Sequence, residues 1–319
     1  MKKLLLFTFV ICMALFTSCT DDSSSGGGGG GGGQTTLKKI SEKYYGYTTK
    51  CYRSYDYGQT WTLEDVWSND MSLSQVWNWD ENKISSIDYY DNYYGTSQCY
   101  STDRFYYNNN GLVSKIVYTY QGEESESVEF TYNGNQLKVI KYYYHNQLES
   151  ANEITYTNNK PSRVTCTYMS SDSLSKHNNQ FMKNMYNLNT QDLVSCRDLP
   201  YTVLTWSGNN LTKWQNYRDG VSYSYATYTY DNKNNPYYGG NSVTTYVVAW
   251  DDEFKLSENN VLTELENYDG DIETSTYSYN YFDDFPMQVF KQTEDVYHYD
   301  DYWTKYVKNY EYSYVFLDD

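Results

Sequence analysis

The sequence predicts an all-β protein built from tandem antiparallel β-hairpin repeats that form a strongly curled or closed meander. Three observations lead to this prediction. Tyrosine occurs 42 times and, together with threonine and valine, favours strands. Asparagine, aspartate and glycine are frequent at positions that suit turns. One motif recurs about every 25 residues along the chain. The exception is a short helix expected near 178–187, where apolar residues recur at helical spacing.

Residues 1–18 have the pattern of a bacterial lipoprotein signal peptide. Lys2 and Lys3 form a positive start, an uncharged apolar run extends from Leu4 to Phe16, and small Thr17 and Ser18 precede Cys19. The run is shorter than the roughly 20 residues that span a bilayer. We expect cleavage before Cys19 and lipidation of that cysteine with palmitate-type acyl chains, with plain secretion as the alternative.

Residues 19–36 are expected to form a lipidated, flexible tether. Three serines and eight consecutive glycines precede the first strand, and such a chain has a root-mean-square span of roughly 20 to 25 Å. Asp21 and Asp22 resemble the surface-export signal of Bacteroidetes lipoproteins. The resemblance implies attachment to the outer leaflet of the outer membrane, facing the exterior; an ordinary polar linker is the alternative.

The net charge argues against one class of partner. Removal of Lys2 and Lys3 with the signal peptide takes the formal charge from −17 to −19. A surface this acidic repels phosphate backbones, so nucleic acid is excluded as an expected partner.

Copies of one repeat unit occupy residues 37–319. Each copy consists of an aromatic strand, a turn rich in asparagine or glycine, and an apolar strand. Phe130-Thr131-Tyr132-Asn133-Gly134-Asn135-Gln136-Leu137 is a clear copy. Each unit predicts a β-hairpin, because asparagine and glycine adopt the positive φ that tight turns need. The third residue of each copy marks the repeat: Trp79, Tyr107, Tyr132, Tyr156, Trp206, Tyr230, Leu256 and Tyr279.

The two chain ends look like complementary half units. Leu37–Ile40 resembles the second strand of a unit, and Tyr310–Tyr314 resembles the first. Nine hairpins and two halves give about 20 strands, more than the roughly 10 that an open sheet usually holds. We therefore expect a curled or closed sheet, with a propeller-like ring as the alternative.

The motif of aromatic-x-Tyr, Asn/Asp-rich turn and Leu-x-x-Ile, seen best from Tyr228 to Tyr237, resembles the uncharacterised Bacteroidetes lipoproteins with YD-like repeats of the DUF4595 type. The resemblance covers roughly residues 37 to 317. It implies an envelope location and a β-repeat fold, and it brings no catalytic residues.

The cysteine and histidine residues give few indications of a functional site. Cys51, Cys99, Cys166 and Cys196 remain in the mature chain, and proximity in sequence favours disulfides Cys51–Cys99 and Cys166–Cys196, with buried free thiols as the alternative. No cysteine or histidine spacing predicts a metal site, and no motif predicts a cofactor or an enzyme.

The strongest binding candidates are four tryptophans within 19 residues: Trp61, Trp67, Trp77 and Trp79. Exposed rings on a rigid sheet are suited to stacking on sugars or protein partners, and core packing is the alternative. We expect a lipid-anchored, non-catalytic binding protein for a glycan or a surface protein. The alternatives are a structural subunit of an outer-membrane assembly and, third, a polysaccharide-acting enzyme.

Overall fold

The computed structural model describes residues 39–93, 96–169, 200–238, 257–268, 271–298 and 301–317. The expected signal peptide, tether and short helix, and the marker Leu256, lie outside these ranges. No helix within them is long and apolar enough to cross a membrane.

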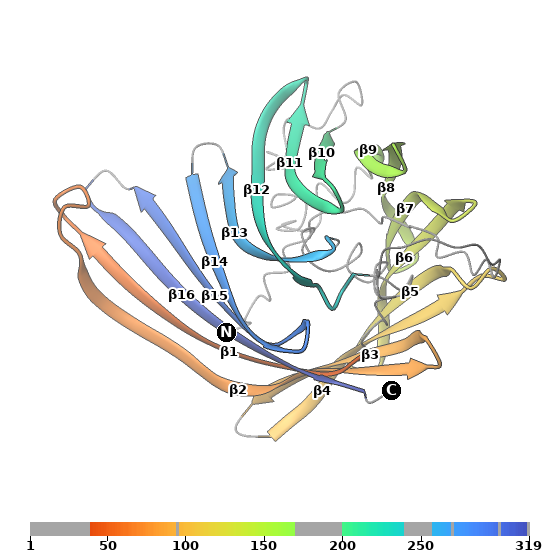
Figure 1. Ribbon diagram of the computed structural model, residues 1–319, viewed down its shortest axis with the longest axis horizontal. Coiled ribbons are helices and arrows are strands. Elements are labelled where there is room, and N and C mark those ends of the chain that lie inside the picture. The colour runs from red at the N-terminus through yellow and green to blue at the C-terminus, as the bar shows by residue number, and fades with distance from the viewer. Residues whose placement is uncertain are drawn as a thin grey trace, which may run out of the picture.

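The described residues form sixteen β-strands in chain order (Figure 1). Their bounds are β1 Ile40–Ser54, β2 Thr62–Asp80, β3 Lys83–Tyr93, β4 Thr96–Tyr107, β5 Val113–Tyr120, β6 Glu123–Asn133, β7 Gln136–Tyr144, β8 Gln147–Thr157, β9 Lys160–Met169, β10 Tyr201–Ser207, β11 Asn210–Arg218, β12 Val221–Asn234, β13 Asn259–Tyr268, β14 Asp271–Phe282, β15 Phe285–His298 and β16 Trp303–Phe316.

The strands close into one antiparallel barrel in which each strand pairs with its neighbours in sequence. Closure occurs between β1 and β16, with Ile40 opposite Phe316 at one end and Ser54 opposite Trp303 at the other. The closed meander is therefore confirmed, and the propeller-like alternative is wrong. The two half units complement each other because each supplies the strand that the other lacks.

The barrel has two rims, which we name by the chain ends. At the near rim β1 begins and β16 ends, and the short turns after β2, β6, β8 and β10 lie there. At the far rim lie the loops after β1 and β15. The predicted turn chemistry is present at the near rim: Gly134 has φ 61°, and Asn158 and Asn159 have φ 52° and 61°.

The side chains of the repeat markers form hydrogen bonds between successive hairpins at the near rim. We call each of these bonds a staple. Each described marker donates its side-chain N–H or O–H to a main-chain carbonyl of the preceding strand. In five cases the distance is 2.7 to 2.8 Å: Trp79 to Ile40, Tyr107 to Ile84, Tyr132 to Val113, Tyr156 to Leu137 and Trp206 to Pro161. Tyr230 bonds Leu211 and Tyr279 bonds Val261 in the same way.

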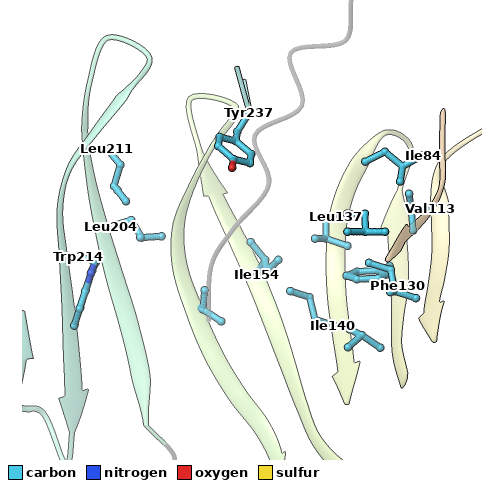
Figure 2. Packing of buried hydrophobic residues seen from close by; sticks show 14 of the residues in the cluster. Ile84, Val113, Phe130, Leu137, Ile140, Ile154, Leu204, Leu211, Trp214 and Tyr237 are labelled. Carbon is cyan, nitrogen blue, oxygen red and sulfur yellow. The ribbon is translucent and has the colours of Figure 1, made fainter. Parts of the chain in front are cut away.

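The inward faces of the strands form one continuous core. Ile84, Leu137, Ile140, Ile154 and Leu211 have no exposed surface. Figure 2 shows such side chains, together with Tyr237, directed into the space between strands on different sides of the barrel. Inward and outward positions alternate along a barrel strand, so the residues between these buried positions form the outer face.

The outer face carries many polar and charged side chains, with exposed apolar side chains such as Leu262, Ile272 and Phe290 among them. Lys115 on β5 pairs with Glu129 on β6 at 3.7 Å, and Lys138 on β7 pairs with Glu153 on β8 at 2.6 Å. Their side chains are 35% to 44% exposed. Threonine and serine occupy further outward positions, such as Thr274, Thr276 and Ser278 on β14, which are all exposed.

Candidate functional site

The structure separates the four predicted binding tryptophans. Trp77 is buried at 3% exposure inside the barrel, and Trp79 stacks against it at 6.4 Å while serving as a near-rim staple. Trp67 is 44% exposed on β2. Trp61 lies in the loop before β2. Trp77 and Trp79 therefore belong to the core, and only Trp61 and Trp67 stay candidates for ligand contact.

Trp61 is part of an aromatic cluster that sequence reasoning missed. The loop between β1 and β2 meets Tyr302 and the start of β16 at the far rim, which brings together five aromatic residues: Tyr55, Tyr57, Trp61, Tyr302 and Trp303. We call these five residues the tip cluster. The Tyr55 and Tyr302 rings lie 6.3 Å apart, and Tyr57 meets Trp303 edge-on at 6.3 Å.

The tip cluster combines exposed rings with rings held by cations. Tyr55 and Tyr57 are 68% and 71% exposed, among the most exposed large side chains of the described chain. The Arg53 guanidinium lies 4.8 Å from the Tyr302 ring, and Lys305 Nζ lies 4.9 Å from the Trp61 ring. These cation–π contacts hold the Tyr302 and Trp61 rings in place. The rings of Tyr55 and Tyr57 stay open to solvent.

A carboxylate orders the loop that carries Tyr55 and Tyr57. Asp56 accepts hydrogen bonds from Ser54 Oγ at 2.6 Å, from the Thr60 main-chain N–H at 2.8 Å and from Thr60 Oγ1 at 2.6 Å. These bonds lower the pKa of Asp56 to about 2, so it is ionised at any physiological pH. Gly58, at φ 82°, lies against the Trp303 ring, where any Cβ would come within 2.8 Å of that ring.

The tip cluster lies at the opposite end of the sheet from the point where the chain enters it. β1 runs from the near rim at Ile40 to Ser54 at the far rim. A strand of 15 residues spans roughly 50 Å at about 3.3 Å per residue. Figure 1 shows the far-rim ends of β1, β2, β15 and β16 gathered at the left of the molecule and the chain end marked C toward the lower right.

A second candidate region is a cavity of about 70 Å³ inside the barrel, near the end of β12. Its wall is aromatic and cationic: Tyr237, Tyr277, Tyr279, Tyr312, Tyr314, Lys43 and Lys291. Tyr237 crosses the interior, because its ring meets Trp77 of β2 at 6.1 Å and its hydroxyl lies 3.2 Å from that of Tyr314 on β16.

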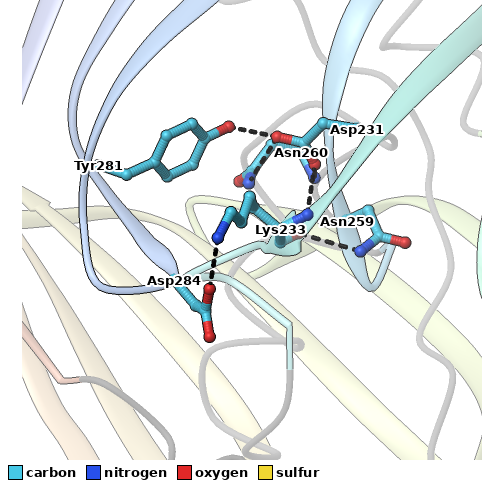
Figure 3. A network of polar contacts seen from close by, with 6 residues as sticks. All are labelled: Asp231, Lys233, Asn259, Asn260, Tyr281 and Asp284. Carbon is cyan, nitrogen blue, oxygen red and sulfur yellow. Dashed lines mark hydrogen bonds and ion pairs between the residues drawn. The ribbon is translucent and has the colours of Figure 1, made fainter.

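A polar network at the near rim supports the segment that carries Tyr237 (Figure 3). Asp231 accepts hydrogen bonds from the main-chain N–H groups of Lys233 and Asn260, and from the Tyr281 hydroxyl. Lys233 Nζ forms an ion pair with Asp284 at 2.7 Å. This network ties the end of β12 to β13 and to the β14–β15 turn, which fixes where the chain turns inward.

Buried acidic side chains lie in the barrel interior, close to Lys291 and further along β14 and β15. Glu264 is 5% exposed; it accepts from the Tyr277 hydroxyl at 2.7 Å and faces Lys291 Nζ at 3.4 Å. Glu273 lies directly opposite Asp295 in the β14–β15 register, and Lys308 forms an ion pair with Asp295. Burial, and then the neighbouring Asp295, raise the pKa of Glu273 to about 7.

Asp103 on β4 is a separate buried acid. It is 1% exposed and accepts from the Tyr89 hydroxyl at 2.7 Å. Burial raises its pKa to about 7. Among 41 acidic residues no sequence signal distinguishes these interior carboxyls, because their position depends on strand register.

The predicted Cys51–Cys99 disulfide is wrong: both are free thiols, Cys51 buried and Cys99 exposed. They lie on β1 and β4, three strands apart around the barrel. Three strand spacings are roughly 14 Å, whereas a disulfide needs Cα atoms about 4.4 to 6.8 Å apart. Cys166 is buried on β9, and Cys196 lies outside the described residues. Within the described ranges no group of three or more His, Cys, Asp or Glu side chains could hold a metal ion.

Comparison with known proteins gives neither a matching family model nor a matching curated sequence. Among solved structures, the chain is similar to a porin-like protein from Bacteroides uniformis, with 9% identity, a TM-score of 0.45, and coverage of 85% of this chain and 97% of that one. A porin-like protein from Bacteroides vulgatus matches at 9% identity and a TM-score of 0.30, covering 88% of this chain and 100% of that one. Ail, the attachment invasion locus protein of Yersinia pestis, matches at 5% identity and a TM-score of 0.18, covering 86% and 98%.

Proposed function

We propose that this protein is a lipid-anchored lipoprotein of the outer membrane that holds a glycan at the cell surface through its tip cluster, without chemistry. The observation that carries the proposal is the tip cluster itself. It presents two open tyrosine rings on an ordered loop at the far rim, where β1 ends at Ser54, and not at the near rim where β1 begins. Lipidation at Cys19 and the export role of Asp21 and Asp22 are part of the proposal.

The geometry supports presentation away from the membrane. The tether of residues 19–36 joins the barrel at the near rim, where β1 begins at Ile40. The tip cluster lies at the other end of β1, a strand roughly 50 Å long at about 3.3 Å per residue, and its height above the near rim is the part of that length that runs along the barrel axis. A ligand in the medium would meet these rings first.

The outer face supports a barrel that stands in water beside the membrane and is held there by lipid. Outward charges occur on strands around the barrel, among them Arg104, Lys115, Glu129, Glu153, Arg163 and Glu294. A lysine or arginine on the lipid face of a barrel costs about 2 to 4 kcal/mol at the bilayer midplane. Several such charges oppose insertion of this face into lipid.

The ring chemistry supports a glycan ligand. An open tyrosine face stacks on the apolar face of a pyranose, and its hydroxyl can donate to a sugar hydroxyl; that of Tyr55 also accepts a hydrogen bond from Arg53 at 3.3 Å. Tyrosine and tryptophan are also the residue types that dominate binding energy at interfaces. Because Asp56 already orders the loop, little conformational entropy is lost when a ligand binds.

The first experiment is a glycan array probed with the folded mature domain and with the double variant Tyr55→Ala, Tyr57→Ala. We expect affinity for the retained glycan to fall by about tenfold or more in the double variant. Tyr106→Ala is the matched control, since Tyr106 is 46% exposed on β4, outside the tip cluster. An array left empty by folded protein, or equal binding by the double variant, would contradict glycan binding at the tip.

Location is tested separately. Cys19→Ala should release the protein from the membrane fraction, and protease applied to intact cells should remove the barrel of the wild type. Protection from protease until the outer membrane is broken would place the barrel in the periplasm and contradict surface exposure.

A further inference from the structure

Most of strand β2 has a strand neighbour on one side only. It pairs with β1 from Thr62 to Val76. Its pairing with β3 begins only at Gln75, opposite Tyr89. Beyond Tyr89, β3 continues with β4 as its partner, from Tyr90 opposite Cys99 onward. Within the described part of the chain, Thr62 to Ser74 therefore form a sheet edge with one strand neighbour.

The exposure of β2 agrees with an open edge. Every residue from Thr62 to Met71 is exposed, including Leu63 at 49%, Val66 at 48% and Trp67 at 44%. A strand that is paired on both sides has its backbone covered and usually one face buried. A run of ten exposed residues thus leaves both faces and one edge in contact with water, which is a template for strand addition.

The central part of this edge has regular backbone geometry. Asp65 to Asn69 pair in register with Cys51 to Tyr47, without a bulge. The main-chain N–H of Val66 donates to the carboxylate of its neighbour Asp65 at 2.8 Å. We infer from this bond that the N–H is directed to the open edge, and alternation in an antiparallel ladder then directs that of Ser68 the same way.

The charges along the edge indicate the chemistry of a partner. Residues 62 to 74 contain Glu64, Asp65 and Asp70 and no basic residue. Glu64 is paired with Arg53 at 3.0 Å. No described cation lies within ion-pair distance of Asp65 or Asp70. An added strand with lysine or arginine would complement these carboxylates.

A second copy of this chain fits the edge poorly. In the antiparallel register centred on Trp67, self-pairing would place Glu64 opposite Asp70, and that register is disfavoured because like charges directly opposite one another destabilise a strand pair. The strongly acidic net charge of −17 also opposes self-association.

We propose that the edge of β2 from Asp65 to Asn69 binds an extended, lysine- or arginine-containing segment of a partner protein as an added β-strand. Main-chain hydrogen bonds to Ser68 and to Val66, whose N–H the added strand takes over from the Asp65 carboxylate, supply affinity, and the carboxylates supply preference for a basic partner. This site uses backbone groups of β2 and is separate from the tip cluster, so it stands whether or not the tip binds glycan.

The test uses the full mature chain and a short synthetic peptide that alternates lysine with valine and threonine. Hydrogen exchange at the amides of Val66 and Ser68 should slow when this peptide is added, and a peptide with glutamate in place of lysine should have no effect. Val66→Pro removes the edge N–H and should weaken peptide binding by about tenfold. Val66→Ala keeps that N–H and is the matched control.

Three results would overturn the proposal. Exchange at Val66 and Ser68 could remain unchanged at saturating lysine peptide, or the glutamate peptide could bind equally well. Alternatively, sedimentation could show that Val66→Ala dimerises and Val66→Pro does not, which would assign the edge to a second copy. The exchange measurement on the wild type decides the matter even if Val66→Pro fails to fold.

Discussion

The phenol of Tyr156 on β8 donates a hydrogen bond of 2.8 Å to the main-chain oxygen of Leu137 on β7. This bond joins one hairpin to the hairpin before it, at the near rim. The same relationship recurs in other repeats, where tryptophan replaces tyrosine at positions 79 and 206. The repeat spacing of the sequence is therefore the spacing of a series of side-chain staples between hairpins.

Loss of one staple should destabilise the barrel measurably. Tyr156→Phe removes the donor and leaves the Leu137 carbonyl without this partner, so we expect a loss of about 1 kcal/mol in the free energy of unfolding. Urea denaturation measures it. Tyr106→Phe, on an exposed ring, should change stability little, and equal effects of the two variants would argue against a role for the staple.

The two classes of tryptophan should respond differently to truncation. Trp77→Ala removes a ring that is 3% exposed and should cost about 3 to 5 kcal/mol. Trp67→Ala removes a ring that is 44% exposed and should cost less than about 1 kcal/mol. Chemical denaturation compares them, and similar losses would contradict the placement of Trp77 in the core.

Gly46 allows β1 to approach β2 closely. A Cβ at this position would lie 3.0 Å from the Met71 main-chain N and 3.2 Å from the Asn69 carbonyl oxygen. Gly46→Val should therefore cost about 1 to 3 kcal/mol. Met71→Ala in the same chain should not restore stability, because the close atoms include backbone. Thr48→Val, two residues along the same face, is the control in thermal unfolding.

The Glu273–Asp295 pair predicts a pH dependence of stability. The pKa of Glu273 is raised from 4.5 to about 7 by folding, so the native state keeps a proton that the unfolded chain has already lost. The free energy of unfolding should fall by about 1 to 2 kcal/mol as pH rises through this window and stay lower above it.

Glu273→Gln should flatten that pH profile, because glutamine does not ionise. The remaining slope should come from Asp103, whose pKa is also raised to about 7, and from Glu126, whose pKa burial also raises, so Asp103→Asn should reduce the slope further. Glu129→Gln, at an exposed outer carboxylate, is the control. A profile of Glu273→Gln that is parallel to the wild type would disprove the assignment.

Thiol reactivity should distinguish the two described cysteines that were expected to pair. Cys99 is exposed and Cys51 is buried. A maleimide added to native protein should label Cys99 rapidly and Cys51 only after unfolding, as read by peptide mass spectrometry. Recovery of a Cys51–Cys99 linked peptide from unreduced protein would contradict the free thiols.

Short-range features of the fold were predictable from the sequence. Asparagine and glycine turns such as Gly134 and Asn158–Asn159 are set by local backbone preference, and the aromatic-x-Tyr motif marks the strand that precedes each turn. The half units at the two chain ends were legible for the same reason, since each contains one recognisable strand of the motif.

Features that depend on long-range register were not predictable. Trp77 and Trp67 have similar local sequence surroundings. Trp77 faces a core assembled from strands all around the barrel, whereas Trp67 lies in the part of β2 that does not pair with β3. Glu273 becomes unusual because the strand register buries it and places Asp295 opposite it. The tip cluster likewise joins residues near 55 and 303, which proximity in sequence could not bring together.

By itself the sequence determined a tandem hairpin meander, because turn chemistry and strand propensity act over a few residues. Closure through β1 and β16, the burial of Trp77, the interior acids and the open edge of β2 were decided by tertiary structure. The physical reason is that burial and pairing at those positions depend on which distant strand lies opposite. That choice is fixed only when the barrel closes.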